Sequence, residues 1–153
     1  MTCVHCDDLR RQLRERDEEL EAWRGNRRDD DAAEARSQRV ERYRALLRGS
    51  GAAISAIGML LLLVDRAGSV IRNDSLLIAS REGRAWLAAD EVCTNVVSVQ
   101  LWKLRRGLRR LAASGRLPEG FGGASGGIET HWAVGYSLTV ENAAALRQLA
   151  GDA

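Results

Sequence analysis

The chain has 153 residues, of which 45% are apolar and 29% charged, and this composition argues against a disordered or membrane-embedded protein. Its 23 basic and 21 acidic residues leave a net charge of +2, so any nucleic-acid surface depends on local clustering of basic residues. Three irregularly spaced cysteines exclude a disulfide framework. The strongest apolar run, 58–64, is far shorter than the roughly 20 residues that span a bilayer. We therefore expect a soluble, cytoplasmic protein with no membrane segment.

Residues 1–48 carry 12 basic and 12 acidic side chains, which is half of all charge in the chain. Apolar residues recur there at heptad-like spacing in two sets, the first with Arg16 in the remaining seam position: Leu9, Leu13, Leu20 and Trp23, then Val40, Tyr43 and Leu47. Gly25-Asn26 separates the sets, so we predict two helices, 7–24 and 31–48. This helical arm is interpreted as a bent coiled coil or helical hairpin that forms a homodimer. The alternative is a solvated helix without a partner.

Residues 49–153 follow the break at Gly49-Ser50-Gly51 and are predicted to form one α+β domain. The expected elements, in chain order, are a helix at 54–64, a short extended piece at 70–71, a helix at 73–80, a loop at 81–91, a helix at about 94–114, a glycine-rich loop at 118–127, a β-hairpin at 128–139 and a helix at 140–149. Three helices followed by a hairpin are typical of a winged helix-turn-helix, here preceded by the arm at 1–48.

A cluster of basic residues marks the third of these helices. Between Lys103 and Arg116 the chain has six basic residues and no acidic one. Helical geometry turns Leu101, Leu104, Leu108 and Leu111 toward a core, and we expect an exposed face of Gln100, Lys103, Arg106 and Arg110. Such a face matches the phosphates along a groove, with base readout near the start of the helix. The alternative is a solvated basic face on a structural helix.

Two segments in this domain carry a family pattern. Val97-Ser98-Val99-Gln100-Leu101-Trp102-Lys103-Leu104-Arg105-Arg106-Gly107-Leu108 resembles the recognition helix of the OmpR/PhoB-type winged-helix effector domain. Ile128-Glu129-Thr130 with Val134-Gly135-Tyr136-Ser137-Leu138 is similar to the wing of that family, with its I-x-T and G-Y-x-L pattern. The resemblance covers about residues 52–139. The family commonly has a basic residue and a glycine where Trp132 and Ala133 stand, and a receiver domain has no counterpart in this sequence.

The resemblance implies a DNA-binding site. In the family the third helix enters the major groove and the hairpin contacts the adjacent minor groove or backbone. By position, the residues expected to face DNA are Asn95, Val96, Ser98, Gln100, Lys103, Arg106 and Arg110 on the helix, and His131 and Trp132 on the wing. The loop at 81–93 corresponds to the segment that can contact RNA polymerase.

The N-terminal Cys3-Val4-His5-Cys6 is a candidate metal half-site. The CxxC spacing places two thiolates on one zinc ion, and a structural zinc needs four ligands. Two paired arms would bring together Cys3 and Cys6 from both chains around a shared zinc. The alternative is a pair of free reduced thiols at the terminus.

No spacing of a phosphate loop, a nucleophile elbow or a zinc protease occurs in the chain, so we expect no enzymatic activity. The sequence predicts a DNA-binding transcriptional regulator of a bacterium or phage, dimerised by its arm. The alternative is a winged-helix interaction module that docks on RNA polymerase or another regulator, which Trp102 and Trp132 would favour as interface anchors.

Overall fold

The computed structural model describes residues 4–52, 54–81 and 95–152. The chain divides into two compact units, Met1–Gln38 and Arg39–Ala153. The second unit therefore begins at Arg39, whereas the sequence analysis set the boundary at residue 49. Within the described ranges, no helix combines the length and the apolar character needed to cross a membrane.

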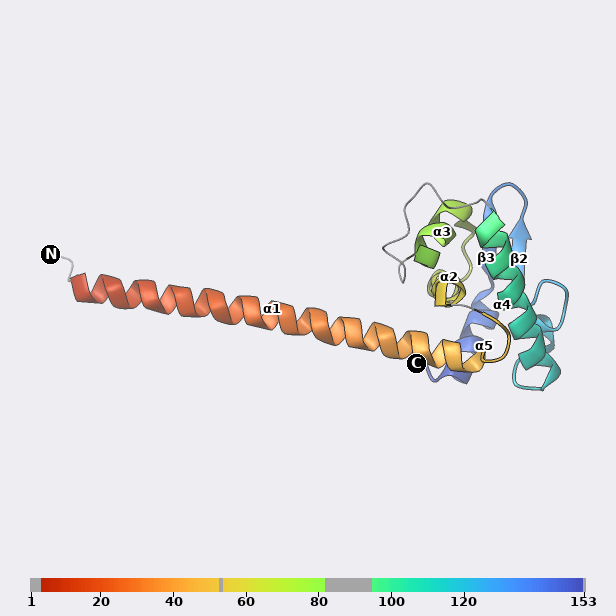
Figure 1. Cartoon of the computed structure of the whole chain (residues 1–153), viewed down its shortest axis with the longest axis horizontal. Coiled ribbons are helices and arrows are strands. Elements are labelled where there is room, and N and C mark those ends of the chain that lie inside the picture. The colour runs from red at the N-terminus through yellow and green to blue at the C-terminus, as the bar shows by residue number, and fades with distance from the viewer. Residues whose placement is uncertain (1–3, 53, 82–94, 153) are drawn as a thin grey trace. The chain divides into compact units, whose positions relative to one another are not determined.

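One uninterrupted helix, α1 (Val4–Leu46), replaces the two helices predicted at 7–24 and 31–48 (Figure 1). The predicted break at Gly25-Asn26 is wrong, and with it the helical hairpin. A glycine inside a helix costs about 1 kcal/mol relative to alanine, which weakens a helix without ending it. Arg24 before Gly25, and Arg27 and Arg28 after Asn26, are good helix formers. Charged pairs such as Arg10–Asp7 and Arg11–Asp8 lie one turn apart along the same helix.

The second unit is an α+β domain. After the end of α1, its elements follow in the order α2 (Ile54–Asp65), β1 (Ile71–Arg72), α3 (Asn73–Arg81), α4 (Asn95–Ala113), a 3₁₀ turn at Glu119–Phe121, β2 (Ile128–His131), β3 (Gly135–Leu138) and α5 (Val140–Ala150). The three strands form an antiparallel sheet in the order β1-β3-β2, with Tyr136 paired to both Ile71 and Thr130. The hairpin, the long helix before it and the last helix are confirmed, with bounds within one or two residues of those predicted.

The core of this unit is built mainly from leucine, isoleucine and valine side chains of α2, α4 and the sheet. The end of α1 also contributes, because Tyr43 and Leu47 are buried there and Val40 packs against them. The interpretation of these three residues as a seam of the arm is therefore wrong. Their helical spacing is real, but it turns them into the core of the second unit, where Tyr43 also donates a hydrogen bond to Asp152, just after the end of α5.

The predicted glycine-rich loop at 118–127 is folded onto the domain. Its single aromatic residue, Phe121, is fully buried, although the sequence analysis gave this segment no core residue. Gly126 has a φ of +55°, and a Cβ there would lie 2.7 Å from the Cα of Arg105. Glycine is required at this position because the loop backbone contacts the backbone of α4 directly.

Candidate nucleic-acid interface

Helix α4 buries one face in the domain core. Leu101, Leu104, Leu108 and Leu111 recur every three or four residues, and all four are buried, as the sequence predicts. Helix α4 therefore has a defined orientation, and the residues on its opposite side face solvent.

The solvent face of α4 combines apolar and basic side chains. Val99 and Trp102 are 48% and 53% exposed, and Arg106 is exposed one turn further along. The Arg106 guanidinium lies over the Trp102 ring, 5.6 Å from its centroid. Ser98 is exposed and Lys103 partly exposed at the edges of this face, and no acidic residue occurs between Asn95 and Leu117. The face is therefore electropositive, with an apolar surface at its centre.

Arg105 joins α4 to the β-hairpin. Its Nη2 donates hydrogen bonds to the carbonyl oxygen of Ile128 at 2.9 Å and to Thr130 Oγ1 at 2.8 Å. The guanidinium also lies 5.5 Å from the centroid of the Tyr136 ring. Burial lowers the pKa of Arg105 below its ordinary value, and an arginine remains cationic after such a shift. These contacts hold the hairpin against the middle of α4, as Figure 1 shows for β2, β3 and α4.

Two residues predicted on the exposed face of α4 are placed differently. Gln100 is half-buried, and its Oε1 has no hydrogen-bond partner within the described part of the chain. Arg110 is exposed, but its Nη1 donates to the carbonyl oxygen of Gly49 at 2.7 Å, so it fastens the turn after α1. Gln100 is half-buried because it lies one helical turn before the buried Leu104, at the edge of the apolar face.

The start of α4 carries the other predicted base-reading residues. Val96 is partly buried and Ser98 is exposed. Asn95 is the first residue of the helix, and its side chain lies outside the described residues. Residues 82–94, which include most of the segment that the sequence analysis compared with a polymerase-contacting loop, also lie outside the described residues.

His131 and Trp132 were both predicted to face DNA, but the hairpin places their side chains differently. His131 is half-buried, and its Nε2 lies 2.7 Å from Ser137 Oγ on the neighbouring strand. Trp132 follows in the turn and is 89% exposed. Ala133 adopts a positive φ of +61°, the conformation that glycine adopts most easily. The hairpin turn therefore presents the Trp132 side chain to solvent, whereas His131 contacts Ser137 in the sheet.

The candidate zinc half-site has one described cysteine. Cys6 is exposed and free on the first turns of α1, and Cys3 lies outside the described residues. Among the residues that the structure describes, no three metal-binding side chains lie together.

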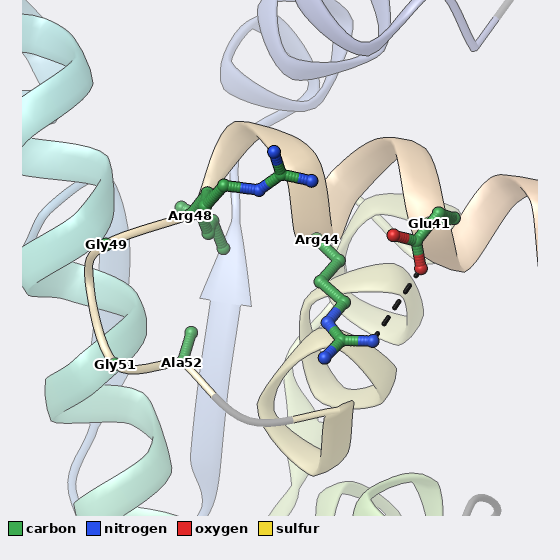
Figure 2. A pocket seen from close by; sticks show the side chains of 7 residues that line it. Glu41, Arg44, Arg48, Gly49, Gly51 and Ala52 are labelled. Atoms are coloured by element: carbon green, nitrogen blue, oxygen red, sulfur yellow. Dashed lines mark ion pairs between the residues drawn. The ribbon is translucent and has the colours of Figure 1, made fainter.

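Sequence reasoning did not consider a shallow pocket at the end of α1. It is lined by Glu41, Arg44, Leu47, Arg48, Gly49, Gly51 and Ala52 (Figure 2). Arg44 Nη1 lies 3.8 Å from Glu41 Oε2, so that carboxylate partly neutralises this arginine. The lining has two cationic side chains and little apolar surface, so it offers an anion a weak contact rather than a built site.

Comparison of the chain with protein-family models, with curated proteins and with solved structures finds no match. The assignment of a function therefore rests on the geometry of α4 and the hairpin.

Proposed function

We propose that the unit Arg39–Ala153 is a winged helix-turn-helix that binds duplex DNA, and that the chain is a transcriptional regulator rather than an enzyme. In this proposal α3 and α4 are the helix-turn-helix and the β2–β3 hairpin is the wing. The exposed face of α4 enters the major groove, and Trp132 reaches the adjacent backbone or minor groove. Helix α1 pairs two copies, so that two such domains bind one site.

The observation that carries this proposal is the solvent face of α4. Lys103 and Arg106 supply positive charge that can neutralise phosphates and release counterions. Val99 and Trp102 supply apolar surface of the kind that contacts thymine methyl groups in the major groove. Arg105 holds the hairpin beside the same helix, so both elements can reach one duplex without rearrangement.

The first test is selection of the full-length protein against a random duplex pool at about 0.15 M salt, where weak electrostatic binding is reduced. Enrichment of two half-sites about one helical turn apart would support sequence-specific binding by a pair of chains. Binding without enrichment would contradict sequence specificity, and no binding would contradict the DNA-binding function.

Charge reversal on α4 then tests the proposed face. The double variant Lys103→Glu and Arg106→Glu is expected to weaken DNA binding by about 100-fold and to lower the slope of log K against log salt by about 2, because two phosphate contacts are lost. Fluorescence anisotropy of a labelled duplex across a salt series measures both quantities. Arg48→Glu with Arg66→Glu, at two exposed positions outside α4, is the matched double control. Equal losses in both variants would show a general charge effect and contradict the assignment of α4.

A second candidate function is docking on RNA polymerase or another transcription protein. The exposure of Trp102 and Trp132 favours it, because large aromatic side chains are the commonest anchors of protein interfaces. Under this alternative, Trp102→Ala abolishes capture of purified polymerase, whereas the charge reversal on α4 leaves it unchanged.

A further inference from the structure

The N-terminal half of α1 carries an uncovered apolar seam. Leu9, Leu13, Leu20 and Trp23 are 47%, 65%, 50% and 58% exposed. Their spacing of four, seven and three residues follows a heptad in which Leu13 and Leu20 occupy a positions, and Leu9, Arg16 and Trp23 occupy d positions. Every described side chain from Cys6 to Gln38 is exposed. Because α1 is continuous over this range, the seam residues lie on one face of the helix. No other described part of the first unit covers that face.

We propose that this seam is covered by a second copy of the chain, aligned in parallel and in register. The charges beside the seam are complementary in that arrangement. Glu19 occupies a g position and Arg24 the e position of the next heptad. In a parallel pair a g residue faces the e residue of the following heptad on the other helix. Glu19 of each copy therefore faces Arg24 of the other, and the two-fold symmetry produces this ion pair twice.

Arg16 determines the alignment of the two helices. Arg16 is the one charged residue of the seam between Leu9 and Trp23, and its layer lies between the layers of Leu13 and Leu20. In the parallel pair its side chain packs beside the e position of the other helix, which is Asp17. This carboxylate offsets part of the repulsion between the two Arg16 side chains. A polar residue at a single seam position selects register at a cost in stability, which is the role that Arg16 has here.

The seam ends at Trp23. The a and d positions that follow are polar or charged: Arg27, Asp30, Glu34 and Ser37. The Arg27 guanidinium lies 5.3 Å from the centroid of the Trp23 ring and covers the last apolar side chain. Pairing is thereby confined to residues 6–24. This inference rests on the pairing role that the proposed function gives to α1, and its test uses no DNA.

Mixing wild-type chain with the variant Arg16→Glu tests the parallel register. Opposite charges then face each other in the mixed pair. The equilibrium constant for forming heterodimers from the two homodimers, measured by native mass spectrometry, is therefore expected to exceed its statistical value by about fivefold. Arg14→Glu is the matched control, because Arg14 is an exposed residue at an outer b position. A statistical mixture for Arg16→Glu, or monomers only at about 100 µM, would overturn the proposal.

Cross-linking provides an independent readout of the direction of the helices. Cys6 occupies an a position, so in the parallel pair it lies opposite Cys6 of the second copy. The full-length variant Cys3→Ser, Cys93→Ser is expected to form a disulfide-linked dimer on mild oxidation. An antiparallel pair centred on this seam would separate the two thiols by roughly 25 Å and leave the chains unlinked, which would overturn the parallel alignment. Chains that cross-link but bind no duplex would instead refute only the proposed function.

Discussion

At the scale of single residues, the hydroxyl of Tyr43 makes the stability of the second unit depend on pH. The ring is fully buried, and the hydroxyl donates to Asp152 Oδ2 at 3.0 Å, an oxygen that also accepts from Arg39 Nε at 2.9 Å. Burial, together with the hydrogen bond and negative charge of Asp152, raises the pKa of Tyr43 to about 12. For Asp152 the burial acts to raise the pKa, but the hydrogen bonds from Arg39 and Tyr43 outweigh it and lower the pKa.

The raised pKa of Tyr43 predicts a loss of stability in alkali. The folded state favours the neutral phenol, so this stabilisation is complete below the ordinary pKa of 10.0 and is lost as the pH rises toward about 12. Tyr43→Phe keeps the ring and removes the titrating group. We expect the variant to be about 1 kcal/mol less stable at pH 8 and to lose less stability than the wild type between pH 10 and 12. Urea unfolding at a series of pH values measures this, and an unchanged alkaline loss in Tyr43→Phe would contradict the assignment.

Ala133 is a second residue with a specific energetic consequence. At its φ of +61° a Cβ is unfavourable by about 1 kcal/mol, and glycine avoids this while adding freedom to the unfolded chain. We therefore expect Ala133→Gly to stabilise the protein by a net amount of about 0.5 kcal/mol. Thermal unfolding measures the change. Ala124→Gly, at an exposed alanine without a positive φ, should be neutral or destabilising, and the same result for both variants would refute the argument.

At the scale of elements, the sheet depends on glycine at the contact of β1 and β3. A Cβ on Gly135 would lie 1.9 Å from the carbonyl oxygen of Ile71, and neither backbone can move without breaking the pairing of Arg72 with Gly135. Gly135→Ala is expected to destabilise the domain by about 3 kcal/mol or more, measured by urea unfolding. Gly123→Ala is the matched control, because a Cβ there meets nothing within 4 Å. A loss below about 1 kcal/mol in Gly135→Ala would show that the strands separate easily.

At the scale of the whole molecule, the domain needs the last turns of α1. Arg39 forms two hydrogen bonds with Asp65, at 2.9 and 2.6 Å, and a third with Asp152. Tyr43 and Leu47 fill the core between these contacts. A chain of residues 39–153 is therefore expected to unfold cooperatively near the melting temperature of the full-length protein. A chain of residues 49–153 should be unfolded or molten, because removal of two large buried side chains costs several kcal/mol. Circular dichroism melts measure both, and equal stability would contradict the boundary at Arg39.

Sequence periodicity by itself determined the helices and the hairpin of the second unit. The leucines of α4 and the alternation before and after Gly135 are local patterns, and they predict the correct elements because hydrophobic spacing and turn chemistry act over a few residues. The basic character of the candidate site could also be predicted from the sequence, because the count of basic residues and helical geometry place Lys103 and Arg106 on one face of the helix.

Only the tertiary structure decided which side chains are exposed and which are engaged in contacts within the chain. The spacing of Tyr43 and Leu47 equals that of Leu9 and Leu13, yet the first two are buried in the domain and the second two are exposed. Gln100 is half-buried, Arg110 holds Gly49, and Arg105 fastens the hairpin. These differences arise from partners far away in the chain, because a side chain's burial depends on long-range packing that a local pattern does not encode.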